Sequence, residues 1–322
     1  MLPPEIASFL KLAGKKHRQH YVFQHYLKAW ATDGKVWARR RGNKKAFHTA
    51  TSNVAVERHF YKLQPATAED LTLIRIAILD GAPIHVRERC ELLIHNFTVP
   101  LTVKRALDPA QPHFEEISAW LDERIINAEE DLHCDVEYGL MPALDDMLNG
   151  KTDLYLESGP AQEFIHAICV QYMRTKRMRE GLSAAIEGTP VPGSDMKRCR
   201  NLFTLIAAMR VADLLYRDRN KYKIVLLDNE TDIPLITGDQ PVINVHATFG
   251  SGVPPDRLEL FYPLSPKRAM ALLELATEGS TALSMNEVQQ FNEMIVRNSH
   301  EQVFSNSGEY LEGLQMDGPQ EV

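Results

Sequence analysis

Three histidines and two glutamines lie within nine residues near the start of the chain, at His17, Gln19, His20, Gln24 and His25. Histidine is the side chain best able to transfer a proton or to bind a transition metal near neutral pH. The spacing of the three imidazoles matches no zinc pattern, and no paired cysteine supports one. We therefore take His20 as a candidate general acid or base. The alternative is that His20 hydrogen-bonds a backbone group and starts a helix.

A second candidate is Asp239, which lies in a Thr-Gly-Asp-Gln-Pro turn after an apolar strand. A carboxylate at the end of a strand can bind Mg²⁺ or act as a general base. The alternative is an Asx-turn, in which Asp239 caps its own backbone while Pro241 fixes the next strand. Both interpretations stay open, and with them the question of a bound divalent metal.

Two segments with a helical pattern contain further charged residues that are candidates for a metal-binding or phosphate-binding role. Glu130 and His133 share a helical face, as in di-iron bundles, but such bundles need two copies of this motif and the chain has one. A solvated helix face is therefore favoured. Arg174 and Arg177 lie three residues apart near the end of a helix, where positive charge favours the helix dipole. Arg174 could also hold a phosphate if its face lines a cleft.

Charge is unevenly distributed along the chain. The whole sequence has a net charge of -7, yet residues 1–60 contain twelve basic and three acidic residues. Such a basic block can bind nucleic acid, because clustered Lys and Arg release counterions from phosphates. It can equally be neutralised by the acidic remainder of the same chain. Nucleic acid is thus a possible partner, and the oligomeric state stays open.

The elements that must position these residues form three regions. Region 15–65 combines a short amphipathic helix with a hairpin, and region 221–310 contains short apolar strands and one helix. Between them the pattern predicts helices over Glu69–Leu79, Ile84–Phe97, Phe114–Leu148, Gly159–Arg179 and Met196–Tyr216. We divide the chain into a basic helix-and-hairpin segment, a helical lobe, a C-terminal sheet with its helix, and an acidic tail, with bounds 1–66, 67–220, 221–310 and 311–322.

Strands at both ends with helices between them predict an α+β fold. The expected sheet is mixed or antiparallel and is formed by the N-terminal hairpin and the C-terminal strands, with a central all-helical lobe. This arrangement would bring the basic block next to the Asp239 turn. A cleft between the sheet and the lobe is where we expect a site.

Composition and the absence of certain sequence motifs argue against several classes of protein. With 322 residues, of which 44% are hydrophobic, the chain can bury a sizeable core, so intrinsic disorder is disfavoured. The sequence has neither a secretory signal pattern nor an apolar run of about 20 residues, and its four cysteines are widely spaced. We therefore expect a cytoplasmic protein with reduced thiols and no membrane partner. Glycine-rich phosphate loops and the Gly-x-Ser-x-Gly motif do not occur.

Several short motifs, taken in order, resemble the bacterial family labelled domain of unknown function 4238. The first motif is His-Tyr-Val-Phe-Gln-His-Tyr-Leu at residues 20–27 of this chain. The family pattern has proline at the position of Phe23. Near the other end, the family's Thr-Ser-Asp-Asn-Pro-Val appears with Gly238 and Gln240 replacing serine and asparagine. The resemblance implies no established activity. Six polar residues of this chain stand at positions of the family's polar motifs: His20, Gln24, Arg174, Asp239, Gln240 and Asn292.

These residues suggest two functions. The chain could be a hydrolase, such as a metal-dependent nuclease, that acts on a phosphate-containing substrate. Asp239 would position a metal or water, and His20 would transfer protons. Arg174 and the basic N-terminal segment would hold phosphates, and Gln24, Gln240 and Asn292 would bind substrate. The alternative is a non-catalytic module that binds nucleic acid or a small ligand through the same polar residues.

Overall fold

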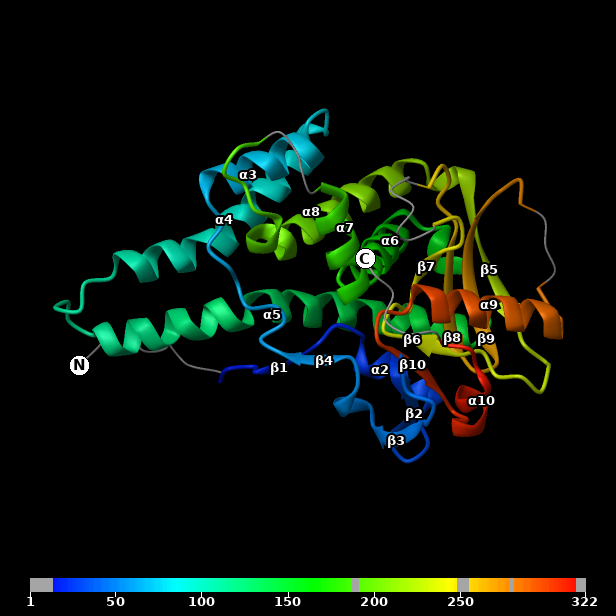
Figure 1. Ribbon diagram of the computed structural model, residues 1–322. Helices are drawn as coiled ribbons and strands as arrows, with labels where there is room; N and C mark the ends of the chain where they lie inside the picture. Colours follow the sequence, from blue (N-terminus) through cyan, green and yellow to red (C-terminus); the bar gives the residue numbers. More distant parts are fainter. Residues whose placement is uncertain (1–13, 187–190, 248–254, 278–280, 317–322) are drawn as a thin grey trace.

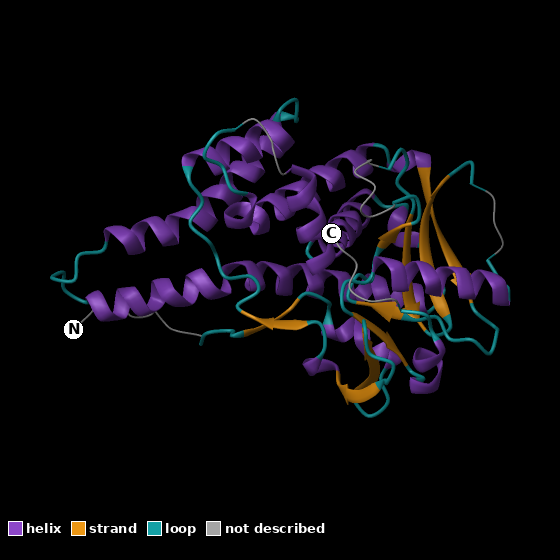
Figure 2. Ribbon diagram, viewed as in Figure 1, coloured by secondary structure: helices purple, strands orange, loops and turns teal. Residues whose placement is uncertain are grey.

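The computed structural model describes residues 14–186, 191–247, 255–277 and 281–316 (Figure 1). It confirms an α+β fold: helices fill the central part of the chain, and antiparallel strands come from both ends (Figure 2). Within the described part of the chain, no helix combines the length and apolar character needed to span a bilayer.

One four-stranded sheet joins the two ends of the chain, as the sequence predicts. Its strands are β3 (Phe47–Ala50), β2 (Lys35–Arg40), β10 (Gln302–Ser305) and β6 (Thr237–Gly238), in that order. The N-terminal hairpin β2–β3 thus pairs through β2 with the last strand, with Ala38 opposite Phe304. The Asp239 turn follows β6 directly, so this pairing fixes its position.

The remaining C-terminal strands form a separate antiparallel sheet. Its order is β5 (Tyr222–Asp228), β9 (Arg268–Glu274), β8 (Leu260–Ser265) and β7 (Ile243–Asn244). We expected one common sheet; the chain instead changes sheet between β6 and β7, at the turn that carries Asp239. A third, two-stranded sheet pairs β1 (Arg18–His20) with β4 (Val56–Arg58).

The helices follow the predicted order with different ends. Two proline-containing helices, α4 and α5, form an arm beside the sheets, and the second of them matches its predicted range (Figure 1). The bounds are α2 Gln24–Leu27, α3 Ala68–Ile74, α4 Ile84–Ala106, α5 Phe114–Leu148, α6 Ser158–Met173, α7 Lys176–Ile186, α8 Met196–Arg217, α9 Met285–Asn298 and α10 Gly308–Gly313. The predicted helix Gly159–Arg179 is therefore two helices, with Arg174 and Thr175 at the break.

A continuous core connects the lobe and the sheets. The larger buried cluster contains Trp30 from the N-terminal region, Ile168 from α6 and Tyr262 from β8. A second cluster lies against α9 and includes Leu311 of α10, which is fully buried. The packed part of the chain therefore continues into the segment whose composition suggested an acidic tail.

Candidate functional site

Arg174 is the centre of a polar cluster at the break between α6 and α7. It follows the last residue of α6 and is 3% exposed, and its Nη2 donates to Glu137 Oε1 on α5. Glu130 of α5 and His20 of β1 are half-buried and lie near enough for Arg174 to lower the pKa of each. Arg174 is thus paired with one acid, Glu137, and its charge acts on a second acid and on an imidazole.

Burial gives the two titrating groups of this cluster unusual proton affinities. Burial raises the pKa of Glu130 to about 7; Arg174 opposes the rise and Glu137 adds to it. Glu130 Oε2 has no hydrogen-bond partner among the described residues. Burial also lowers the pKa of His20, with Arg18 and Arg174 adding to the decrease. At neutral pH His20 is then uncharged, and Glu130 exchanges between its two forms, which suits acid–base chemistry.

Gln24 fixes the ring of His20. Its Nε2 lies 2.9 Å from His20 Nδ1, and His20 Nε2 lies 3.1 Å from the carbonyl oxygen of Ser52. Because the amide nitrogen donates, Nδ1 accepts and the ring proton resides on Nε2, which donates to Ser52. The backbone hydrogen bond expected as the alternative for His20 is present. Since both ring nitrogens are engaged, Glu130 is the group of the cluster better placed to exchange a proton.

A second layer of charge lies deeper, on the face of α5 that carries His133. His133 is 2% exposed and its neighbour Glu129 is fully buried, so this face is not the solvated one that we favoured. Glu129 pairs with Arg179 of α7, and His133 Nε2 lies 3.5 Å from Glu129 Oε1. Burial lowers the pKa of His133 to about 4. The sequence contains the spacing of Glu129 and His133, but nothing in it locates the partner cation on another helix.

Asp239 is fully buried and faces backbone rather than a cavity. Its carboxylate accepts hydrogen bonds from the N–H groups of His300 (2.7 Å), Glu301 (2.7 Å) and Gln302 (3.0 Å). Burial raises the pKa of Asp239, and the three N–H groups restrain the rise. Asp239 thus caps the turn between α9 and β10, not its own backbone. Its predicted role in catalysis stays a prediction.

Gln240 joins the helical break to the Asp239 turn. It accepts a hydrogen bond from the Thr175 hydroxyl, and its Nε2 donates to the carbonyl oxygens of Tyr172 (3.1 Å) and Val242 (2.7 Å). The Thr175 hydroxyl also accepts from the backbone N–H of Met178 (3.4 Å), as an N-cap residue does. Gln240 therefore positions the segment from which Arg174 extends.

Asn292 of α9 is buried and holds two other segments. Its Oδ1 accepts from the N–H of Ile236 (2.9 Å), and its Nδ2 donates to the carbonyl oxygen of Pro234 (2.9 Å) and to the Tyr310 hydroxyl (2.8 Å). These bonds fix the approach to β6 against α9 and α10. The structure thus joins Gln24 to His20 by a hydrogen bond within reach of the charge of Arg174, and it places Asp239, Gln240 and Asn292 in hydrogen-bond networks with backbone groups.

Gly238 stands where the resembling family pattern has serine. A Cβ atom at this position would lie 2.0 Å from Ser299 Oγ and 3.2 Å from the carbonyl oxygen of Gln302. The Ser299 hydroxyl, which donates to the carbonyl oxygen of Ile295, occupies the space that a side chain at 238 would need. A serine at 238 therefore requires a smaller residue or a different rotamer at 299.

Part of the basic N-terminal block is neutralised within the chain. Ion pairs join Lys15, Lys16 and Lys45 to Asp122, Asp131 and Glu312, respectively. Arg39 and Arg41 donate to backbone carbonyl groups in the segment 296–314. Several other basic side chains of the block are exposed: Arg18, Lys28, Lys35, Arg40, Lys44 and Arg58. Lys11 lies outside the described residues, and nucleic acid stays a predicted partner.

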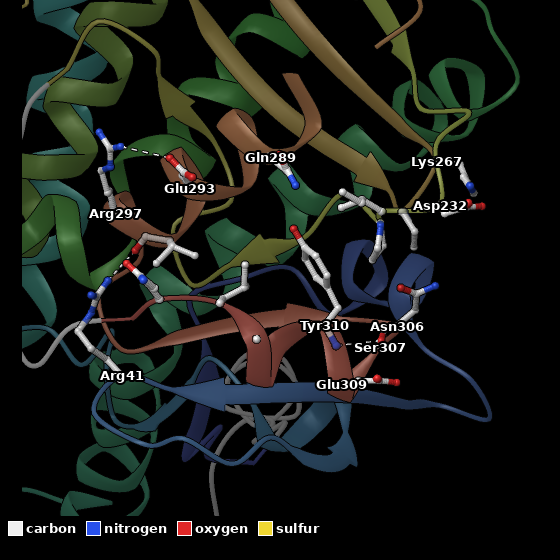
Figure 3. Close-up of a pocket in the computed structure, with 17 residues that line it drawn as sticks. Arg41, Asp232, Lys267, Gln289, Glu293, Arg297, Asn306, Ser307, Glu309 and Tyr310 are labelled. Atoms are coloured by element: carbon white, nitrogen blue, oxygen red, sulfur yellow. Dashed lines mark hydrogen bonds and ion pairs between the residues drawn. The ribbon is translucent and has the colours of Figure 1, made fainter. Parts of the chain in front are cut away.

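A large cavity of about 1010 Å³ opens between α9, α10 and the segments 232–234 and 266–267 (Figure 3). Tyr310 lines it, and Asn292 supports Tyr310 from behind. Both positive side chains such as Arg297 and negative side chains such as Glu293 line the cavity. The lining therefore does not favour a ligand of either charge. Among the described residues, no three His, Cys, Asp or Glu side chains are grouped to hold a metal ion.

Comparison with known proteins places the chain in a family. No curated protein and no solved structure matches it. The family model described as a protein of unknown function, DUF4238, matches residues 18–309, which is nearly the whole chain and includes all six predicted site residues. The chain therefore belongs to the DUF4238 family.

Proposed function

We propose that the chain is a hydrolase that acts on a phosphate-containing substrate at the Arg174 cluster, defined as His20, Gln24, Glu130, Glu137 and Arg174. The observation that carries the proposal is geometric: the half-buried Glu130 lies two turns before Glu137 on the same face of α5, and Glu137 accepts from the buried Arg174 guanidinium. An arginine fork matches the geometry of phosphate oxygens and keeps its charge at all relevant pH values. A carboxyl that titrates near neutral pH can activate water or protonate a leaving group.

In this proposal each residue of the Arg174 cluster has a separate task. Glu130 exchanges the proton, Arg174 attracts the phosphate, and Glu137 orients the guanidinium by accepting from its Nη2. His20 and Gln24 form the accessible edge and present polar groups to the substrate. Asp239 receives no chemical task, because its carboxylate faces three backbone N–H groups. A divalent metal, if used, would be held by one or two carboxylates together with substrate phosphates, the usual manner for Mg²⁺.

The second candidate function is a binding module without turnover. It is favoured by two observations: Arg174 is already paired with Glu137, and both ring nitrogens of His20 are engaged. Such a site could recognise a nucleic acid or a small anion and leave it intact. The exposed lysines and arginines of residues 18–58 would then contribute salt-sensitive binding.

The test is a cleavage assay on labelled RNA, labelled DNA and p-nitrophenyl phosphate, with and without Mg²⁺. Glu130→Gln is expected to lower kcat by at least about 100-fold, the usual contribution of a positioned acid or base. Asp135→Asn is the matched control, since Asp135 lies on the exposed face of the same helix. It is expected to leave kcat unchanged.

A loss of activity in Glu130→Gln is distinguishable from unfolding. Because the pKa of Glu130 is higher in the folded chain than in the unfolded one, its ionisation disfavours folding as the pH rises from about 4.5 to about 7. The amide removes this cost, so the Tm of Glu130→Gln at pH 8 is expected to equal or exceed that of the parent. Unchanged turnover in this variant contradicts the role of Glu130. Salt-sensitive binding without cleavage by the parent supports the binding module.

We also infer a cytoplasmic location. Cys90, Cys134, Cys169 and Cys199 are all free, and three of them are buried. Proteins of oxidising compartments generally pair their cysteines. Burial raises the pKa of the Cys90 thiol to about 11, so this group stays protonated and unreactive near neutral pH.

A further inference from the structure

A separate cavity lies where α4, α6 and α8 meet. Its volume is about 410 Å³, within the range of small-molecule pockets. Its walls include Val86 of α4 and Met209, Ala212 and the ring of Tyr216 on α8. Val86 and Ala212 are buried, and Met209 and Tyr216 are half-buried. An apolar body of one or two rings would therefore be shielded from water there.

Four basic side chains line this cavity. His85 and Arg89 come from α4, His166 from α6 and Arg217 from α8. Arg89 and His166 both line the cavity, and burial lowers the pKa of His166, with Arg89 lowering it further. Neither has a hydrogen-bond partner or an ion pair among the described residues.

The acidic side chains of the lining do not cancel this charge. Asp213 already accepts contacts from Arg210 (3.2 Å), Arg217 (3.1 Å) and His85 (3.2 Å), so its charge is compensated. Glu163 is exposed, as Arg89 is, and among the described residues the two side chains form no ion pair with each other. One guanidinium, that of Arg89, and one neutral imidazole are left to meet a ligand. This combination matches a single negative charge better than the double charge of a phosphate monoester.

We propose that the cavity between α4, α6 and α8 binds a small organic carboxylate, with its apolar body against Met209, Ala212 and Tyr216 and its carboxylate at Arg89 and His166. Arg89 supplies the countercharge, and His166 donates a ring N–H to the second carboxylate oxygen. This inference is independent of the proposed hydrolase.

Isothermal titration of the full chain with two isosteric probes tests the proposal. 2-Naphthoate is expected to bind at least about tenfold more tightly than the neutral 2-naphthamide, because a charge-assisted hydrogen bond to arginine contributes about that factor. Arg89→Met is expected to remove most of this preference, so that the affinity for 2-naphthoate falls close to that for 2-naphthamide. The matched control is Arg105→Met, an exposed arginine near the other end of α4, which is expected to change nothing.

The outcomes separate specific binding from adsorption. Equal affinity for the two probes, or binding of neither, overturns the proposal. An equal loss in Arg89→Met and Arg105→Met shows general charge attraction and also overturns it. 2-Naphthyl phosphate serves as a third arm, and tighter binding of this dianion than of 2-naphthoate contradicts the choice of a carboxylate. His166→Phe keeps the apolar surface. It is expected to lower the affinity for 2-naphthoate and to leave the affinity for 2-naphthamide unchanged.

Discussion

In Asp239→Ala, the free energy of unfolding is expected to fall by about 3 to 5 kcal/mol. The substitution leaves the backbone N–H groups of His300, Glu301 and Gln302 without the carboxylate that now accepts from them. A buried donor that loses its partner costs about 1 to 3 kcal/mol. The relief of removing a buried charge offsets only part of this loss. Urea unfolding monitored by circular dichroism measures the change.

Asp232→Ala is the control for this prediction. Asp232 lies seven residues earlier and is exposed, so its removal is expected to change stability by less than about 0.5 kcal/mol. The unfolding experiment and the cleavage assay together decide between the two roles of Asp239. A variant with parental stability and no activity would show that the carboxylate acts in catalysis. A large loss of stability would show that it is a cap between α9 and β10.

Arg179→Met is expected to be similarly destabilising, by about 3 to 5 kcal/mol. Arg179 is 2% exposed, pairs with the fully buried Glu129, and lies 4.4 Å above the Phe60 ring and 4.8 Å above the Tyr61 ring. Burial opposes ionisation of Glu129, but Arg179 and His133 hold its pKa below the ordinary value. Without the guanidinium, burial dominates and the pKa of Glu129 rises. The loss of unfolding free energy in Arg179→Met, relative to the parent, is therefore expected to grow as the pH increases from 5 to 8.

A double variant and a surface control complete this experiment. Glu129→Leu combined with Arg179→Met removes both charges and is expected to recover most of the lost stability, because apolar residues can replace a buried ion pair. Arg124→Met breaks the ion pair with Asp131 on the surface, where the arginine side chain is 48% exposed. Its expected cost is below about 1 kcal/mol. A double variant no more stable than Arg179→Met would contradict this account of the buried charges.

The sequence predicts those parts of the fold that local pattern determines. The hairpin, the helix Phe114–Leu148, and the short strands with one helix in region 221–310 all agree with the structure in type. In each, apolar residues repeat with one period and turn residues stand at the ends. The sequence also predicts that the two ends of the chain share a sheet, because strands at both ends need partners. The pairing of β2 with β10 confirms this.

The sequence did not predict features that depend on distant partners. The break after Met173 interrupts an apolar pattern that continues, and it is fixed by the hydrogen bond of Thr175 to Gln240. Three backbone N–H groups beyond α9, far along the chain, satisfy Asp239. Glu129 and Glu130 appear as ordinary helical acids in the sequence. Only the packing of α5 against the α6–α7 break buries them.

The most direct test of the Arg174 cluster is a carbon-13 NMR titration of the glutamate carboxyl groups in the full chain. The spectrum of Glu130→Gln, recorded in parallel, identifies the resonance of Glu130 by its absence. We expect that resonance to titrate with a midpoint of about 7, because burial disfavours its ionised form. A midpoint near the ordinary 4.5 would contradict the proposed acid–base group and the site built around it.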